Sequence, residues 1–169
     1  EKTHGVTWHT MTEQIDSGEI LKQAIVEINE GETAFTLNGK CYEAAIASFT
    51  EMISELRQNT AVLTQQDFTK RSYFSRSRQS SDGCLILWNR DAQEIDALVR
   101  GLDFGPYPNS LGMAKFFIDN QPLIVTQTQV TSFTSTARPG TITAIRDNFI
   151  TVATTSYDIE LHKLMTLNG

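Results

Sequence analysis

The first part of the chain alternates apolar and polar residues, and this pattern predicts two β-strands with a polar turn between them. In the first run, residues 5–11, Trp8 points to one face and His9 to the other, as the two-residue period of a strand requires. Residues 12–18 are polar and rich in turn formers, and an extended, β-branched pattern resumes over residues 19–28. A side chain on this turn would lie at a strand end, where many catalytic and binding residues of α/β proteins are found.

Apolar residues then recur at spacings of three and four, which predicts a helix packed on a sheet, with Thr33 as its N-cap. The apolar positions of this helix are Leu37, Cys41, Ala44, Ala45, Phe49, Met52, Ile53 and Leu56. Gly39 inside a helix costs about 1 kcal/mol relative to alanine. We therefore expect a short separate turn before Gly39 and the main helix after it.

Residues 61–84 lose this periodicity and are expected to form a linker. The segment mixes basic and aromatic side chains, namely Lys70, Arg71, Arg76, Arg78, Tyr73 and Phe74. Such a mixture can contact phosphate or RNA. Four basic side chains would displace only a few counterions from a nucleic acid, which gives weak binding. The favoured interpretation is therefore a solvated segment held to the protein surface by its two aromatic side chains.

The remaining residues predict a helix followed by five short strands. Asn89 is the expected N-cap of a helix that runs to about Leu102, with Ala92, Ile95, Leu98, Val99 and Leu102 facing inward. The expected strands are 116–118, 123–130, 141–145, 149–153 and 157–164, with turn residues between them. Five short strands favour a small β-barrel.

Composition and charge exclude several classes of protein. The chain has 169 residues, 40% of them hydrophobic, which suits one globular domain or two small ones. No apolar run approaches the roughly 20 residues of a membrane helix, and a cytoplasmic location is expected. Residues 1–66 hold ten acidic and four basic side chains, residues 67–84 two and four, and residues 85–169 eight and six. This balance lacks the basic excess of nucleic-acid binders.

Cysteine and histidine give no metal-site pattern. Cys41 and Cys84 are too far apart for a zinc knuckle or a redox pair, so reduced, mostly buried thiols are expected. His162 has no partners at ligand spacing and is interpreted as a surface or rim histidine. We therefore expect no metal.

The turn after the first strand carries the candidate chemistry. An Asp before Ser-Gly is a common turn signature that needs no function. In combination, however, six residues resemble the signature of the folate-dependent formyltransferases: His4, Gly5, His9, Asp16, Ser17 and Gly18. The resemblance implies that 10-formyltetrahydrofolate is the cosubstrate, that Asp16 is catalytic with His9 supporting it, and that Thr12, Ile15, Asp16 and Gly18 contact the folate. A His9 ring that is merely satisfied by the backbone at the sheet edge is an equally good interpretation.

The resemblance also implies a domain plan. The family's catalytic Asn-x-His lies upstream of the region represented here, so residues 1–60 are expected to be the closing part of a Rossmann-like α/β catalytic domain. Residues 61–84 would be the linker. Residues 85–169 resemble the family's small OB-like β-barrel C-terminal domain, through Ile86, Trp88 and Pro139-Gly140. The chain is therefore expected to need the missing N-terminal half, to be inactive alone, and to expose an apolar sheet edge or helix face.

The segment LDFGPYPNSLGMAK, residues 102–115, resembles formyltransferase domains of nonribosomal peptide synthetases. That resemblance implies an aminoacyl group on a carrier domain as the formyl acceptor, with adenylation and carrier domains as partners. Methionyl-tRNA and amino-sugar formyltransferases remain alternatives. So does a non-catalytic docking module, in which the Asp16 turn has lost its role.

Overall fold

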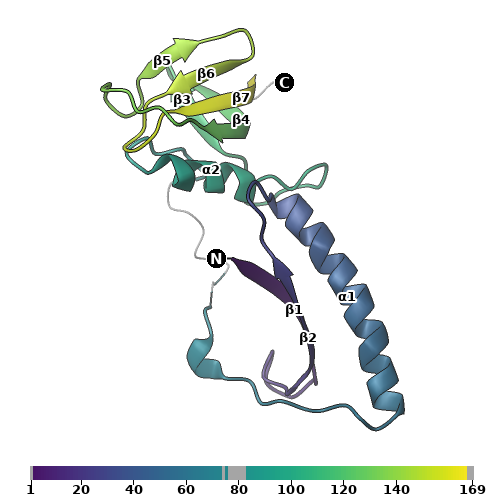
Figure 1. Cartoon of the computed structure of the whole chain (residues 1–169). Helices are drawn as coiled ribbons and strands as arrows, with labels where there is room; N and C mark the ends of the chain where they lie inside the picture. The colour runs from purple at the N-terminus through teal and green to yellow at the C-terminus, as the bar shows by residue number, and fades with distance from the viewer. Residues whose placement is uncertain (1, 74, 76–82, 167–169) are drawn as a thin grey trace. The chain divides into compact units, whose positions relative to one another are not determined.

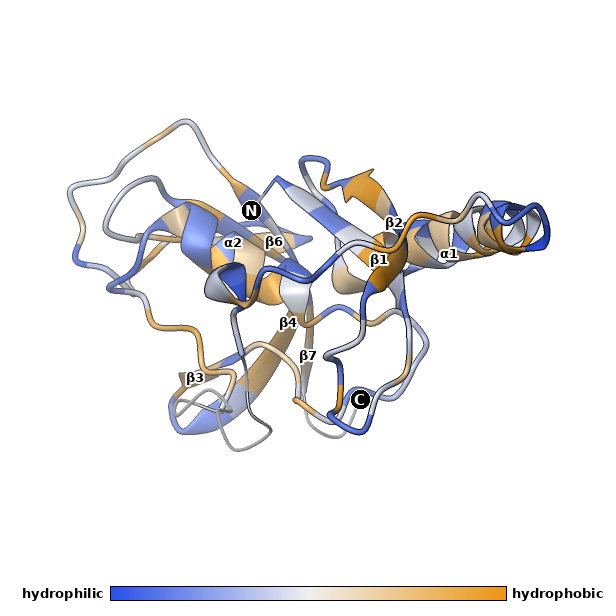
Figure 2. Cartoon of the chain, turned by 90° about the horizontal axis from the view of Figure 1, so that it is seen from below, coloured by the Kyte–Doolittle hydropathy of each residue, from blue (hydrophilic) through white to orange (hydrophobic). Residues whose placement is uncertain are grey.

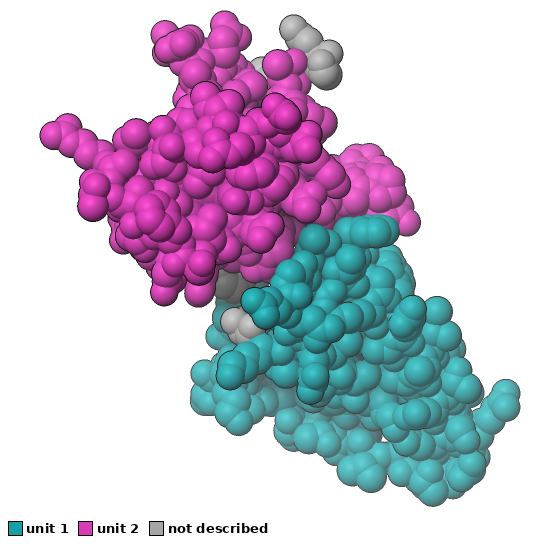
Figure 3. All heavy atoms as spheres, turned by 45° about the horizontal axis from the view of Figure 1, so that its top comes forward, with its two compact units in different colours: residues 1–75 teal, residues 76–169 magenta. Residues whose placement is uncertain are grey.

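A computed structural model describes residues 2–73, 75 and 83–166 of the chain. The chain divides into two compact units, residues 1–75 and 76–169 (Figure 3). In chain order (Figure 1), the elements are β1 (Thr3–His9), β2 (Ile20–Glu27), α1 (Ala34–Arg57), the 3₁₀ turn η1 (Phe68–Lys70), α2 (Ala92–Gly101), β3 (Lys115–Ile118), β4 (Gln121–Val130), β5 (Ile142–Ile145), β6 (Phe149–Val152) and β7 (Ile159–Thr166).

The first unit is an antiparallel hairpin, β1 and β2, with α1 alongside it (Figure 1). Trp8 points toward α1, where its indole nitrogen donates a hydrogen bond of 3.0 Å to the Ser48 hydroxyl and its ring lies 5.1 Å from that of Phe49. Trp8 thus faces the helix side of the hairpin, and the strand begins at Thr3 rather than at residue 5. The strand ends at His9 rather than at residue 11, because the chain leaves the ladder there and turns into the loop.

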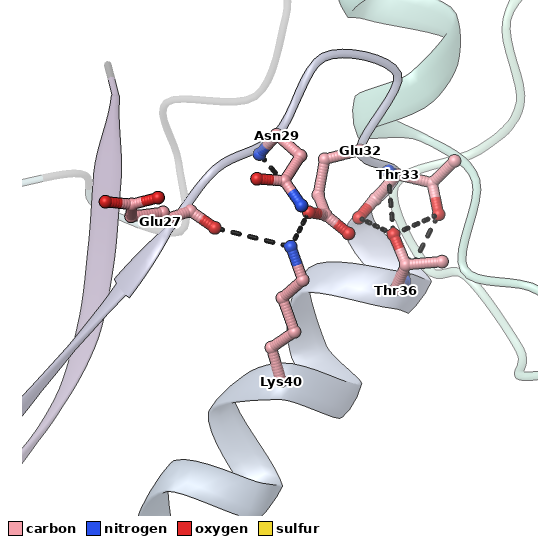
Figure 4. A network of polar contacts seen from close by, with 6 residues as sticks. All are labelled: Glu27, Asn29, Glu32, Thr33, Thr36 and Lys40. Atoms are coloured by element: carbon pink, nitrogen blue, oxygen red, sulfur yellow. Dashed lines mark hydrogen bonds and ion pairs between the residues drawn. The ribbon is translucent and has the colours of Figure 1, made fainter.

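The start of α1 is fixed by a network of polar contacts (Figure 4). Thr33 is the N-cap, as the sequence predicts, and it forms a capping box with Thr36. The Lys40 ammonium pairs with the Glu32 carboxylate, which also accepts a hydrogen bond of 3.3 Å from the Asn29 amide. These contacts tie the turn after β2 to the first turns of the helix.

The expected break at Gly39 is wrong. A single helix runs from Ala34 to Arg57 without interruption. A Cβ at position 39 would meet no atom within 4 Å, so nothing in the surroundings requires glycine there. The Thr33 cap and the packing against the hairpin outweigh the small backbone cost of one glycine.

The first unit buries very little. Among its described residues, Ser48 and Met52 are the only side chains of α1 that are buried. Phe49 and Leu56, which the helical spacing assigns to the core, keep 44% and 43% of their surface exposed. The face of α1 that these residues share is therefore only partly covered by the hairpin.

The second unit is a helix, α2, packed on an antiparallel sheet in the order β3-β4-β7-β6-β5. The N-cap of α2 is Asp91, whose carboxylate accepts from the Gln93 amide at 2.8 Å, so the prediction of Asn89 is wrong by two positions. The inward positions of α2 are predicted correctly: Ala92, Ile95 and Val99 are buried, and Leu98 and Leu102 pack against the same cluster.

The core of the molecule lies in this unit. It consists of Ile86, Ala92, Ile95, Val99, Ala114, Phe116, Val125, Val152, Ile159 and Leu161. Figure 2 shows hydrophobic residues along β4 and on one side of α2. All five predicted strands are present, with ends shifted by up to two residues. Within the described residues β3 and β5 do not pair with each other, so the sheet is an open half-barrel rather than a closed barrel.

Within the part of the chain that the structure describes, no helix has the length and apolar character needed to span a membrane. The same residues contain no cluster of three or more His, Cys, Asp or Glu side chains arranged for a metal ion. Cys41 and Cys84 are both free thiols, and Cys84 is buried.

Candidate catalytic site at the β1–β2 loop

The loop between β1 and β2 is closed at its base by the backbone. The Thr10 amide donates to the Glu19 carbonyl at 2.9 Å. Gly18 lies against the same turn, where a Cβ would come within 1.8 Å of the Thr10 carbonyl oxygen. No side chain fits at that distance, so the closure of the loop requires glycine at position 18.

Short side chains fix the interior of the loop. The Thr12 and Ser17 hydroxyls both donate to the Gln14 carbonyl, each at 2.8 Å, and lie 2.7 Å from each other. Asp16 follows in the left-handed region, with φ of 54°, a conformation that aspartate tolerates better than most residues. The loop is thus a self-supporting turn that presents the Asp16 side chain outward.

His9 and Asp16 come together at the mouth of the loop. His9 Nε2 lies 3.7 Å from Asp16 Oδ1, with 30% and 71% of the two side chains exposed. The register of the hairpin shifts between Trp8 and His9, so that His9 opposes Ile20 and its ring is turned toward the loop. His9 Nδ1 is 2.9 Å from the Thr10 carbonyl oxygen, so this nitrogen carries a hydrogen and donates it.

The Nδ1–H tautomer of His9 determines how its ring can interact with Asp16. With Nδ1 committed to a carbonyl, Nε2 either holds a lone pair or, when protonated, faces the Asp16 carboxylate as a cation. At 3.7 Å the two groups are too far apart for a direct hydrogen bond, so a proton accepted by the carboxylate would reach the ring through water. The arrangement therefore suits acid–base chemistry at a solvent-accessible position.

Gln66 is a residue of this site that the sequence does not reveal. Its side-chain amide donates to the carbonyl oxygens of Asp16 at 3.1 Å and Gly18 at 2.5 Å. The segment that carries it is held beside β2 by two backbone hydrogen bonds between Ile20 and Thr64, of 2.8 and 3.0 Å. Part of the expected linker therefore supports the Asp16 loop.

The same segment forms one wall of a pocket next to Asp16. Asp16, Gln66, Phe68, Arg71 and Tyr73 are among the residues that line it. The Arg71 guanidinium carbon lies 5.6 Å from the centre of the Tyr73 ring, a cation–π distance. The aromatic and basic residues of the segment thus line a pocket beside the candidate carboxylate.

The charges in this pocket are balanced. Lys70 Nζ lies 3.3 Å from Asp67 Oδ2. The Thr69 hydroxyl, and after it Lys70, hold the pKa of the Asp67 carboxyl below its ordinary value. Together with Asp16 and Arg71, this pair gives the pocket two acidic and two basic side chains. Phe74, Arg76 and Arg78, which belong to the same basic and aromatic cluster of the sequence, lie outside the described residues.

The other residues assigned to folate by the resemblance lie on the same loop. Ile15 is 83% exposed and adjoins Asp16, while the Thr12 hydroxyl is committed to the loop interior. Gly18 is buried by the close approach of Thr10. Ile15 thus offers an exposed apolar surface beside the acid. Thr12 and Gly18 shape the loop itself.

His162 belongs to the second unit and to a different environment. Its Nε2 lies 3.2 Å from the Glu160 carboxylate and its ring is 5.1 Å from that of Phe149, both on the same sheet. These contacts join His162 to neighbouring side chains of the sheet, and neither of them involves the candidate site at Asp16. The structure is consistent with the interpretation of His162 as a rim histidine.

Comparison with known proteins identifies the fold. Residues 79–169 match the family described as formyl transferase, C-terminal domain. The chain is similar to the N-formyltransferase from Helicobacter canadensis, solved with folinic acid and dTDP-3-aminofucose, with a TM-score of 0.72 and 22% identity over 96% of this chain and 56% of that chain.

Two further solved structures are also similar to the chain. For HypX from Aquifex aeolicus in complex with tetrahydrofolic acid, the TM-score is 0.69 and the identity 15%, over 99% of this chain and 28% of that chain. For the methionyl-tRNA formyltransferase from Clostridium thermocellum, the TM-score is 0.52 and the identity 18%, over 96% of this chain and 57% of that chain. The chain thus spans little more than half the length of the Helicobacter enzyme. The family match covers more than half of the 169 residues, and the chain belongs to the formyl transferase family.

Proposed function

We propose that this chain is part of an enzyme that transfers the formyl group of 10-formyltetrahydrofolate to an amine, with Asp16 as the proton acceptor. The observation that carries the proposal is the pairing of Asp16 with His9 on a loop whose closure requires Gly18. Membership of the formyl transferase family supports the same reaction class. The Helicobacter and Aquifex relatives, solved with folinic acid and with tetrahydrofolic acid, support a folate as the cosubstrate.

Asp16 has a defined task in this reaction. An amine that is protonated in water must lose a proton before its nitrogen can attack a formyl carbon. The Asp16 carboxylate takes this proton, directly or through water, and becomes neutral; His9 Nε2, 3.7 Å away, can then receive the proton through water. The folate would supply the formyl group, and the exposed Ile15 side chain would contact its ring system.

The acceptor in our proposal is the amino group of an aminoacyl residue tethered to a carrier domain. Two features support it: the resemblance of residues 102–115 to peptide-synthetase formyltransferase domains, and the excess of eight acidic over six basic side chains in residues 85–169. In the structure, Leu111 of this segment is 53% exposed, and so accessible to a partner. A tRNA acceptor would instead require several phosphate contacts from basic residues.

Mass spectrometry of the products tests this function. The complete enzyme that contains this chain is incubated with 10-formyltetrahydrofolate and one of three acceptors: an aminoacylated carrier domain, aminoacylated initiator tRNA, or a nucleotide-linked amino sugar. We expect formylation of the carrier-bound aminoacyl group. Formylation of the tRNA, with binding that weakens steeply as salt is raised, would overturn the acceptor assignment, and formylation of none of the three would overturn the function.

A further inference from the structure

The side chain of Asp16 is not held in place by its own contacts. It is 71% exposed, and the His9 ring nitrogen lies 3.7 Å from its carboxylate, beyond the reach of a direct hydrogen bond. The direction of the carboxylate therefore depends on the backbone at position 16, which has a φ of 54°. A group that holds this backbone also holds the candidate proton acceptor.

Gln66 is such a group. Its side-chain nitrogen lies 3.1 Å from the Asp16 carbonyl oxygen and 2.5 Å from the Gly18 carbonyl oxygen. Because both partners are acceptors, the amide nitrogen of Gln66 must face them, and it has one hydrogen for each. Gly18 is itself held at the base of the loop by the close approach of Thr10. Gln66 thus ties the carbonyl of Asp16 to the fixed end of the loop.

The segment that carries Gln66 is anchored beside the hairpin by the two residues directly before it. The chain leaves α1 and passes the β1–β2 loop on its way to η1 (Figure 1). Thr64 exchanges two backbone hydrogen bonds with Ile20, and the Gln65 side-chain amide donates to the Glu19 carboxylate at 2.7 Å. The position of Gln66 is therefore set from outside the loop whose backbone it binds.

The loop has its own support and does not depend on Gln66 to fold. Two hydroxyl groups inside the loop donate to the Gln14 carbonyl, and the Thr10 amide closes the base. The Gln66 side chain is only partly buried. Loss of its two hydrogen bonds should therefore let Asp16 move while the rest of the unit stays folded.

We infer that Gln66 is a positioning residue for formyl transfer, whose two hydrogen bonds hold the Asp16 carboxylate where it receives the proton of the acceptor amine. The inference rests on the proposed function, and it adds a residue that lies outside the signature of six residues ending at Gly18. A displacement of a reacting group by about 1 Å can cost on the order of 10²-fold in rate. Removal of the Gln66 donors should therefore slow the transfer although every catalytic group is still present.

A double-mutant cycle in the complete enzyme tests this role. Gln66→Met keeps the length of the side chain and removes both donors, and Gln66→Glu keeps its shape but has no hydrogen to donate when ionised. Each is made alone and together with Asp16→Asn. Gln58→Met is the matched control, since the Gln58 amide donates to the Ser54 hydroxyl at the end of α1. The kcat with 10-formyltetrahydrofolate and the acceptor that the enzyme formylates is measured with the melting temperature.

We expect Gln66→Met and Gln66→Glu to lower kcat by about 10- to 100-fold, with each variant folded at the assay temperature and Gln58→Met close to the parent. In the Asp16→Asn background, the same substitutions should change kcat by less than about 2-fold, because no carboxylate is left to position. Parent-like turnover of the Gln66 variants would overturn the inference. An equal loss with and without Asp16 would also overturn it, since Gln66 would then act on the fold. If Gln66→Met does not fold, Gln66→Glu decides by the same criteria.

Asp16→Asn alone separates this inference from the proposed function. Slow turnover of Asp16→Asn with parent-like turnover of the Gln66 variants would overturn the inference and leave the proposed function standing. Parent-like turnover of Asp16→Asn would overturn both.

Discussion

Gly18 lies so close to Thr10 that a Cβ at position 18 would come within 1.8 Å of the Thr10 carbonyl oxygen and 2.6 Å of its hydroxyl oxygen. The two residues belong to opposite ends of the loop that carries Asp16. Because Thr10 also donates its amide hydrogen to Glu19, a shift of either strand end would break the closing hydrogen bond. The position of Asp16 relative to His9 therefore depends on a residue without a side chain.

Gly18→Ala should consequently open the loop. Overpacking of this kind costs about 1–3 kcal/mol, and we expect the melting temperature of the protein to fall. Gly39→Ala is the matched control, since a Cβ there meets nothing within 4 Å and the residue lies in α1. It should raise stability by about 0.5–1 kcal/mol. Equal effects of the two substitutions would contradict the close approach at Gly18.

Asp158 is the buried polar centre of the second unit and should be sensitive to substitution. Its carboxylate is 1% exposed and accepts hydrogen bonds from the Ser135 amide and hydroxyl, at 3.0 and 2.9 Å, and from the Thr143 hydroxyl at 3.0 Å. Asp158→Ala leaves these donors without an acceptor, at a cost of about 1–3 kcal/mol for each one left buried. Asp147→Ala, in the turn before β6, is the control in a denaturant titration and should be nearly neutral.

The Glu32–Lys40 pair should make the first unit sensitive to acid. The hydrogen bond from the Lys40 ammonium, followed by that from Thr36, holds the pKa of the Glu32 carboxyl below its usual 4.5. A lowered pKa in the folded state stabilises the fold above pH 4.5, and this stabilisation is lost as the pH falls through the lowered value. Glu32→Gln should therefore melt at a lower temperature than the parent at pH 7, with the difference shrinking toward pH 3.

The control for this comparison is Glu30→Gln, which changes an exposed carboxylate two residues away. Its effect should be small at both pH values. A Glu32→Gln melting difference that stays constant from pH 7 to pH 3 would mean that the pair contributes through packing and not through charge.

The spacing of apolar residues predicted the helices and strands better than it predicted the contacts between them. The spacing of Ile95 and Val99 predicts their burial directly, because it follows from the geometry of one helix. The N-cap of α2 was misplaced because Asn89 and Asp91 are both good caps and only the packing decides between them. Whether five strands close into a barrel depends on contacts between distant strands, which no local pattern contains.

The site shows the same division. The turn chemistry and the family signature predicted a loop that carries Asp16, and the structure brings Asp16 within 3.7 Å of His9. The support from Gln66 was not predicted, because its hydrogen bond to the Asp16 carbonyl joins residues 50 positions apart. The exposure of Phe49 does not follow from the helical spacing, which gives no measure of how much of an apolar face is covered; only the resemblance led us to expect an exposed apolar face.

The assignment of Asp16 as the proton acceptor is the central claim, and one substitution tests it most directly. Asp16→Asn keeps a side chain that tolerates the φ of 54° found here, so the loop should fold as before. Glu13→Gln, in the same exposed loop, is the matched control. Both variants are made in the full-length enzyme, and turnover of 10-formyltetrahydrofolate is measured together with the melting temperature.

We expect Asp16→Asn to lower turnover by about 10²- to 10⁴-fold, the usual contribution of a positioned acid–base group, while its melting temperature and the turnover of Glu13→Gln stay close to those of the parent. Near-normal turnover of Asp16→Asn would contradict the account and would leave Asp16 as a turn residue.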